Sequence, residues 1–538
     1  MDEWVLTWMT FMPLIGAAVV LCLPSSAPDL VRGVATAFTV PPLLLAVWVL
    51  QHFDPSNTAP QFVQRAWWIE TYRIEYFVGI DGISIAMVAL TALLSFLCMI
   101  ASYGIDKAVK GYFALFLLLE TGMLGTFVAL DLFLFYVFWE LMLLPMYFLI
   151  GIWGGPRREY AAIKFFLYTL FGSVLLLVVL LYLYFTPDPH SFDMTALGGL
   201  VKDAIPLHVQ VLLWFALFIG FAIKIPAFPF HTWLPDAHVE APTAISVILA
   251  GVLLKMGTYG ILRINYGILP EATLAPFAGY TVAFWALAAL GTLNIIYGAL
   301  CAMAQRDLKK LVAYSSISHM GYVMLGMAAF TSQGINGAVL QMFNHGTITA
   351  MLFLLVGVIY DRAHHRDIEG FGGLASIMPV YTGVTGFAFF AAMGIPGLSA
   401  FISEVLVLLG SWRAYPILTV VSASAMVLTA GYMLWALQRM YLGAPNPKYA
   451  DTGWEIDGRE LFTLAPLAAI VLVLGVYPQP ILKLQSPSLV SLIDRVQQAA
   501  PGAGDTAIAG AVAGDPAAAS TVAAVRMPAA PAAPAAAD

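Results

Sequence analysis

Charged side chains are scarce in this chain of 538 residues: they make up 10% of it, whereas hydrophobic residues make up 61%. A soluble globular chain carries about a quarter charged residues. The low charge therefore excludes an ordinary soluble domain. The net charge of −7 is spread over many short loops and leaves no basic patch for nucleic acid. This composition predicts an all-α, polytopic membrane protein embedded in a lipid bilayer.

Cysteine is also scarce. Cys22, Cys98 and Cys301 lie in three separate apolar runs without metal-ligand spacing, so we interpret them as small buried hydrophobic residues. The sequence also lacks a glycine-rich dinucleotide loop, a P-loop and a cysteine set for an iron–sulfur cluster. We therefore expect no cofactor and no metal ion in this chain, and no redox chemistry of its own.

Long apolar runs, in contrast, are abundant. Runs of about 20 residues predict about fourteen transmembrane helices. They lie near 4–23, 31–50, 83–103, 111–130, 132–152, 160–185, 208–227, 242–265, 275–300, 308–330, 335–360, 376–412, 415–442 and 461–481. The run 376–412 is too long for one straight helix, so we expect a break in it.

Two lysines stand inside such runs. A lysine at the centre of a bilayer costs roughly 3 kcal/mol or more, so Lys224 and Lys255 are predicted to be functional. Pro226 closely follows Lys224 and cannot continue a helix, so the seventh span is expected to break there. Broken helices at membrane depth occur where freed backbone groups line a polar cavity. Lysines beside such a break indicate an ion path.

Carboxylates occur in the apolar runs as well. Glu140 lies near the middle of its span and needs either a cation or a proton, and Lys224 or Lys255 is the candidate partner. A protonated acid bonded to backbone is the alternative for Glu140, and a stronger one for Glu120. In the twelfth span, Glu404 follows a second break, which is marked by Gly394, Pro396 and Gly397.

Histidines accompany these groups. His319 and His345 lie in predicted helices, and we interpret them as proton relays because histidine exchanges a proton near neutral pH; structural core histidines are the alternative. The polar cluster of His231, Asp236, His238 and Glu240 invites a metal site. It lacks HExxH spacing and is interrupted by prolines, so no metal is expected there. The charged loop with His364 and His365 is interpreted as solvated.

The two breaks suggest an internal repeat. Pro226 and Pro396 lie roughly 170 residues apart, close to the spacing between the starts of the fourth and ninth spans. An odd number of spans per repeat makes the copies inverted. We therefore divide the chain into helices 1–3 (1–110), a first repeat (111–265), an inverted second repeat (266–442), the last helix with its flank (443–500) and a disordered Ala/Pro-rich tail (501–538). The Lys and Arg distribution favours both termini outside.

At this point four segments resemble a known family. They are KIPAFPFHTWLPDAHVEAPTAISVILAGVLLKMGTYG, FWELMLLPMY, RDLKKLVAYSSISHMGYV and the broken helix with Glu404. They look like the antiporter-like subunits of respiratory complex I, the NADH:quinone oxidoreductase, and the match extends to about residue 485. Glutamate at position 404 is typical of the M type, whereas the L and N types usually carry lysine there.

This resemblance implies a fourteen-helix fold with two inverted five-helix repeats and broken helices seven and twelve. It implies one proton channel of a larger enzyme in the bacterial inner (plasma) membrane, with both termini on the periplasmic side. Family roles carry over to the pair Glu140 and Lys224, to Lys255 as the central lysine, to His319 and His345 as relays, and to Glu404 as the exit-side group. NADH, FMN, iron–sulfur clusters and quinone are expected in partner subunits. L-type and N-type subunits are expected on either side of this chain.

The residue chemistry agrees with proton transfer. An ammonium has no lone pair for a metal ion and repels sodium. A carboxylate beside a buried lysine favours its protonated form, so moving Glu140 away from Lys224 would release a proton. Two alternatives remain: a subunit of a multisubunit sodium/proton antiporter or a membrane-bound hydrogenase, and a structural membrane scaffold whose buried charges only hold helices together.

Overall fold

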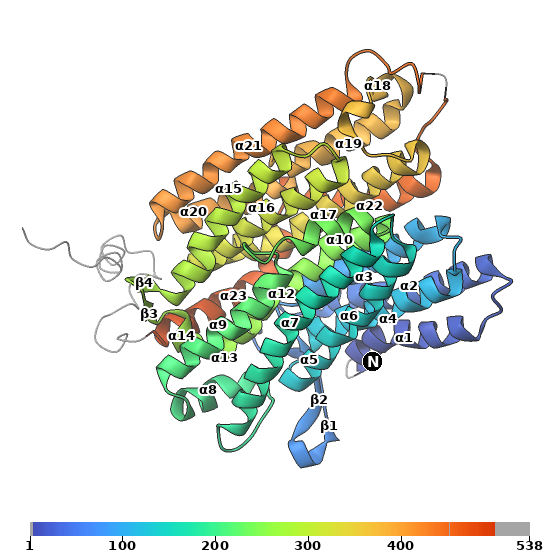
Figure 1. The fold of residues 1–538 in the computed structure, drawn as a ribbon. Helices are drawn as coiled ribbons and strands as arrows, with labels where there is room; N and C mark the ends of the chain where they lie inside the picture. The colour runs from blue at the N-terminus through green and yellow to red at the C-terminus, as the bar shows by residue number, and fades with distance from the viewer. Residues whose placement is uncertain (1–3, 451, 501–538) are drawn as a thin grey trace, which may run out of the picture.

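The computed structural model describes residues 4–450 and 452–500, and these are mostly helical (Figure 1). Twelve of the described helices are long and apolar enough to cross a membrane. They are α1 (Val5–Cys22), α2 (Pro28–His52), α3 with its terminal turn (Ile85–Gly104), α4 (Val109–Val128), α5 with α6 (Leu132–Trp153), α7 (Arg158–Phe185), α9 (Leu207–Lys224), α11 to α13 (Thr243–Ile268), a π-helical segment with α15 (Phe284–Met303), α17 (Ser332–Ala363), α21 (Pro416–Tyr441) and α22 (Gly458–Val476).

Two further predicted spans take other forms. Helix α16 (Leu308–Ala328) is long enough, but its serines and His319 lower its hydropathy. The long run 376–412 is divided into the short helices α19 (Pro379–Ala392) and α20 (Ser399–Trp412), which confirms the predicted break. Together with the other twelve helices they account for every predicted span.

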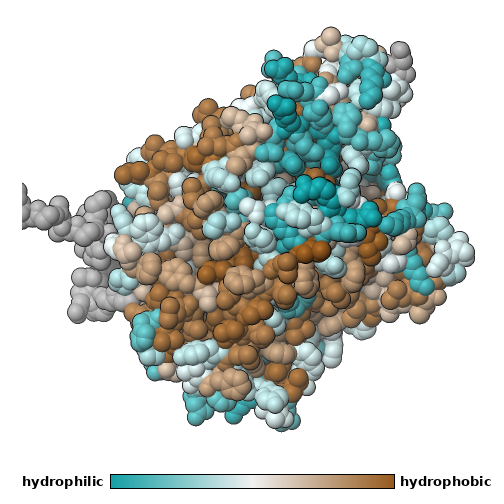
Figure 2. Space-filling model, viewed as in Figure 1, coloured by the Kyte–Doolittle hydropathy of each residue, from teal (hydrophilic) through white to brown (hydrophobic). Residues whose placement is uncertain are grey.

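The surface divides into an apolar belt and polar ends. Figure 2 shows hydrophobic residues over the middle of the molecule and hydrophilic residues gathered at the upper right, around α10 (Trp233–Glu240) and α18 (Leu374–Ile377). A second hydrophilic fringe lies at the bottom, below α8 (Met194–Ala204). This distribution fits a bundle that crosses a bilayer between the two polar ends.

A small hairpin marks one end of the bundle. Strands β1 (Gln61–Ile69) and β2 (Ile74–Ile80) pair antiparallel between α2 and α3. A second, two-residue pairing joins β3 (Pro276–Phe277) and β4 (Tyr280–Thr281). Trp67 and Trp68 of this hairpin are 57% and 51% exposed, and exposed tryptophans are typical of membrane–water interfaces. We call this the hairpin end.

Matched local structures occur in the two predicted repeats. Asp131 caps α5 (Leu132–Leu141) and pairs through its backbone with Asp193. In the same way, Asp307 caps α16 and pairs with Asp367. Asp131 lies beside the hairpin, whereas Asp307 lies beside the C-terminal end of α17, so α5 and α16 begin at opposite ends of the bundle. This is the arrangement that inverted repeats produce.

Both ends of the described chain lie at the hairpin end. Thr7 of α1 is within 2.7 Å of the Tyr76 hydroxyl in β2. Helix α23 (Gln479–Gln498) packs there too, because the Gly82 amide donates to Ser488 Oγ at 3.1 Å. The predicted positions of the termini and the predicted disorder of the tail concern residues 1–3 and 501–538, which lie outside the described residues.

Candidate functional site

The seventh span breaks directly after its lysine. Helix α9 ends at Lys224, and helical structure resumes at Trp233 in α10. Side chains satisfy the freed backbone: the Phe228 amide donates to Asn294 Oδ1 at 2.8 Å, and the Trp233 indole donates to the Ile223 carbonyl at 2.8 Å. The predicted break is confirmed, and it is held by specific partners.

Lys224 lies against an aromatic ring. Its side chain is 3% exposed, and its Nζ lies 4.1 Å from the centre of the Trp139 ring. Glu140 is within electrostatic range, but among the described residues no carboxylate oxygen lies within the 4.0 Å of Lys224 Nζ that would make an ion pair. Glu140 Oε1 is buried and has no hydrogen-bond partner among the described residues. The two predicted partners are therefore neighbours that form no ion pair here.

Lys255 is the most enclosed of the predicted residues. It lies in α12 (Leu254–Gly260), immediately after a π-helical turn over Leu249–Leu253, and is 0% exposed. Its Nζ donates to the Ala250 carbonyl and lies 2.7 Å from His345 Nδ1. π-Helical turns are often found at functional sites. The lysine is thus fixed against a histidine from α17.

Three more predicted residues continue this contact. The rings of His345 and His319 lie 5.8 Å apart between their centres, and His319 Nδ1 lies 3.2 Å from Glu404 Oε1. All three residues are at most 5% exposed. Lys255, His345, His319 and Glu404 therefore form one buried row across α12, α17, α16 and α20, which we call the central row.

The second break makes room for the end of this row. Gly394 has a φ of +70°, in the region that favours glycine. A Cβ at this position would lie 2.6 Å from Glu404 Oε2. Glycine is therefore required both by the backbone conformation and by the carboxylate beside it.

Neutral polar residues hold the broken helix against α17. Asn344 Nδ2 donates to the Ser399 carbonyl at 2.7 Å and to Ser403 Oγ at 3.0 Å, and Ser403 in turn donates to Gln341 Oε1 at 2.5 Å. This is the helix-joining role expected for amides and hydroxyls in a membrane. A cavity of about 10 Å³ beside Gln341, His319 and His345 offers room for about one water molecule.

Comparison with known proteins shows which family the chain belongs to. Residues 129–429 match the family described as NADH:quinone oxidoreductase/Mrp antiporter, TM. NADH-quinone oxidoreductase subunit M of Rickettsia bellii is 44% identical over 489 residues, covering 90% of this chain and 97% of that protein. The chain belongs to this antiporter family. Subunit M of Rhodobacter capsulatus is 43% identical, with 91% and 96% covered, and NADH-ubiquinone oxidoreductase chain 4 of Marchantia polymorpha is 38% identical, with 91% and 97% covered.

Solved structures agree with this assignment. A chain of respiratory complex I from Thermus thermophilus superimposes with a TM-score of 0.81 at 28% identity, covering 91% of this chain and 99% of that one. A chain of the Mrp complex from a Dietzia species gives 0.79 at 22% identity, with 93% and 99% covered, and shows the shared fold alone. The resemblance drawn from the sequence motifs is confirmed.

One buried histidine of this antiporter-family chain was considered from sequence only as a metal ligand. His238 is 0% exposed and stacks on Phe353 with ring centres 4.5 Å apart, and neither ring nitrogen has a hydrogen-bond partner in the described part of the chain. It lies within electrostatic range of Lys255 and of Lys309, which is itself buried and donates to the Ala241 carbonyl at 2.6 Å. In the sequence His238 lies between Lys224 and Lys255, and this position could have indicated that it belongs with the buried lysines. Within the described residues, no three His, Cys, Asp or Glu side chains gather as a metal site.

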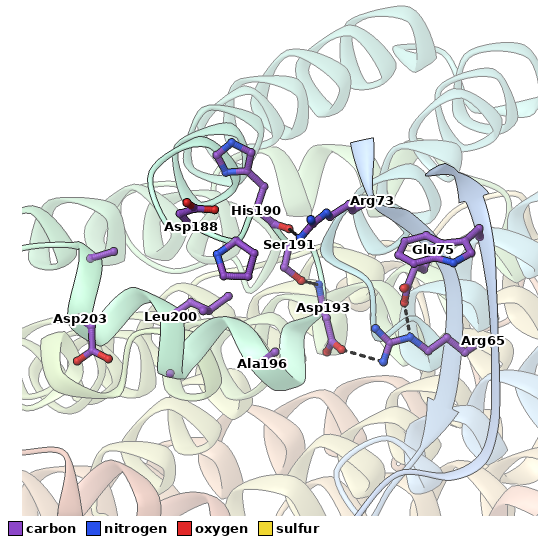
Figure 3. Close-up of a pocket in the computed structure, with 14 residues that line it drawn as sticks. Arg65, Arg73, Glu75, Asp188, His190, Ser191, Asp193, Ala196, Leu200 and Asp203 are labelled. Carbon is purple, nitrogen blue, oxygen red and sulfur yellow. Dashed lines mark hydrogen bonds and ion pairs between the residues drawn. The ribbon is translucent and has the colours of Figure 1, made fainter. Parts of the chain in front are cut away.

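A surface pocket of about 820 Å³ lies apart from the central row, between the hairpin and α8 (Figure 3). Arg65 lines this pocket and forms ion pairs with Glu75 and, at 3.1 Å, with Asp193. The hydrogen bond to Glu75 raises the pKa of Arg65, so this arginine is firmly cationic. The paired charges tie the hairpin to the loop before α8.

Proposed function

We propose that this chain is the M-type proton-translocating membrane subunit of a NADH:quinone oxidoreductase, and that Glu140, Lys224, the central row and His238 form its proton path. The alignments with the relatives named subunit M cover 97% and 96% of the length of those relatives. The observation that carries the proposed path is the central row itself. It places two bases, a lysine and a carboxylate in succession inside a bundle where each is almost fully buried.

The groups in the row suit protons better than metal ions. An ammonium offers no lone pair to sodium, whereas an imidazole accepts a proton at one nitrogen and donates from the other. In the proposed path Lys255 gives its proton to His345 Nδ1 across 2.7 Å. His319 then passes a proton to Glu404 across 3.2 Å. The small cavity beside both histidines lies where one water would connect His345 with His319.

The remaining assignments extend the proposal to the complex. Redox chemistry in partner subunits, which would hold NADH, FMN, iron–sulfur clusters and quinone, changes the charge or hydration near Glu140 and Lys224. L-type and N-type subunits flank this chain in the bacterial inner membrane. The hairpin end is the periplasmic side, and Glu404 delivers protons toward it. The repeats occupy 111–265 and 266–442.

A sodium/proton antiporter subunit is the second candidate, because the Mrp chain shares the fold. Its identity of 22% is about half that of the subunit M relatives. The family match spans both groups, and the higher identity favours the NADH:quinone oxidoreductase.

The test is NADH-driven proton translocation in membrane vesicles that carry Glu140→Gln, with assembly checked on a native gel. We expect normal assembly and lost pumping, because glutamine keeps the shape of the side chain but carries no proton. Glu159→Gln is the matched control, since Glu159 lies exposed in the first turn of α7. An assembled Glu140→Gln complex that pumps at the rate of the control would make Glu140 a structural acid. Sodium/proton exchange in cells without the other complex I subunits would favour the second candidate.

A further inference from the structure

The ring beneath Lys224 is held in place from three sides. Trp139 lies in α5, is 2% exposed, and donates from Nε1 to Ser173 Oγ of α7 at 3.2 Å. Phe221, one turn before Lys224 in α9, meets the indole edge-to-face with ring centres 5.5 Å apart, and Phe135 stacks on it at 5.7 Å. The indole is therefore oriented before the lysine meets it.

The lysine is placed over this ring as a cation. The distance of 4.1 Å from Nζ to the ring centre is within the range of a cation–π contact, and tryptophan gives the strongest such contact among the aromatic residues. Lys224 is also the last residue of α9, where the helix dipole favours positive charge. Among the described residues the ammonium makes no hydrogen bond or ion pair, and the Trp139 ring is its cation–π partner.

We propose that Trp139 is a positioning residue whose ring face gives the ammonium of Lys224 a second binding position, as an alternative to the carboxylate of Glu140. We call these two binding positions seats. This inference rests on the proposed proton path. Trp139 and Glu140 are consecutive residues of one helix, so their side chains point about 100° apart. The four-carbon stem of lysine reaches either group by changing its rotamers. The exchange between seats therefore requires no movement of the backbone.

The two seats differ in what they do to the proton. A carboxylate attracts the ammonium and also accepts its proton, whereas the face of an indole attracts the charge but has no lone pair that accepts a proton. While Lys224 rests on Trp139, its proton cannot return to Glu140. The ring therefore keeps the lysine charged and separate from the acid, so that the onward proton acceptor receives the proton.

The test compares Trp139→Leu and Trp139→Phe in the assembled complex, with pumping measured from pH 6 to 9. Removing the ring removes a contact that favours the charged lysine. In Trp139→Leu we expect the alkaline pH at which pumping falls to half to shift lower by about one unit, a tenfold change in proton affinity. Trp139→Phe keeps a weaker ring and should shift it by less than half as much. Trp214→Leu is the matched control, because Trp214 is an equally buried indole of α9 that donates to Thr273 and has no cation–π partner in the described part of the chain.

A pH profile of Trp139→Leu that coincides with the profile of Trp214→Leu would overturn the inference. If Trp139→Leu does not assemble, fluorinated tryptophans introduced at position 139 keep the shape of the ring and weaken its attraction for a cation stepwise. The half-pumping pH should then fall with each added fluorine, and a constant value would overturn the inference. Loss of pumping in Glu140→Gln together with an unshifted Trp139 series would leave the proposed function standing and remove only the second seat.

Discussion

A buried ion pair at the hairpin end offers the most direct test of how the helix with the central lysine is held. Arg263, two turns after Lys255, donates to both oxygens of Asp81 at 2.7 and 2.8 Å. Asp81 is 5% exposed and precedes α3. Arg263 also donates to the Tyr259 hydroxyl at 3.1 Å, and that hydroxyl donates to the Phe127 carbonyl. The contact thus joins the eighth span to the third and fourth.

The expected cost of Arg263→Gln follows from this geometry. Removing one partner of a buried pair leaves an uncompensated charge and costs about 3–5 kcal/mol. Asp81 keeps the backbone amides of Ile83 and Ser84 as donors, so we expect the lower part of this range, about 3 kcal/mol. The double variant Asp81→Asn with Arg263→Gln removes both charges. It should recover about 2 kcal/mol of that loss, because no buried charge remains unpaired.

The assay is thermal denaturation of the solubilised complex, with the assembled fraction read from native gels. Lys202→Gln is the control, because Lys202 is 63% exposed, lies 3.8 Å from Glu271 at the same end, and should matter by less than about 1 kcal/mol. The reasoning is wrong if Arg263→Gln is no more harmful than Lys202→Gln. It is also wrong if the double variant is no more stable than Arg263→Gln alone.

Two further predictions concern the breaks and caps. Gly394→Ala should assemble but pump at less than a tenth of the normal rate, because the added Cβ displaces the Glu404 carboxylate from His319. The control is Gly397→Ala, which has a similar backbone strain at φ +93° but no described atom near the added Cβ, and it should pump nearly normally. Equal pumping rates in the two variants would contradict the prediction. Burial raises the pKa of Asp131 from 3.8 to about 6, so the folded chain holds the carboxyl proton more tightly than the unfolded chain does. The stabilisation from the protonated carboxyl is therefore fully present below pH 3.8 and is lost as the pH rises through 6. The stability of Asp131→Asn relative to the natural chain should therefore rise between pH 4 and pH 7, and melting temperatures of the two chains that differ by the same amount at both pH values would show the sign to be wrong.

Most of the fold could be predicted because its causes are local in sequence. Span positions follow from apolar run length, and both breaks follow from prolines and glycines that stand beside an ionisable residue. The sequence also predicted that each buried charge needs a partner, because an isolated charge in hydrocarbon is too costly. Glu404 and Lys255 were identified for this reason, and the structure shows both beside a histidine.

The rest depended on tertiary contacts. The hairpin of β1 and β2 pairs residues of a loop whose alternation is weak, and α23 is too polar to register as a span. Trp139 reads as one apolar residue among many in FLFYVFWELM, because nothing in the spacing tells which aromatic ring faces the lysine. His238 was overlooked as a relay for a similar reason: its two unpartnered nitrogens become visible only when the surrounding helices are in place.

The contrast between the two halves of the proposed path has a mechanistic meaning. In the central row Lys255 lies 2.7 Å from His345, the two imidazole rings lie 5.8 Å apart and His319 lies 3.2 Å from Glu404, whereas among the described residues Lys224 makes no ion pair and lies over the Trp139 ring. A path with every link closed at once would let protons run in both directions and dissipate the gradient, so a pump requires at least one link that opens. In the proposed path this link is Lys224, whose flexible side chain follows the last turn of α9, lies over the Trp139 ring and has Glu140 nearby. A signal from partner subunits that shifts the lysine between these two positions would control proton entry while the central row stays in place.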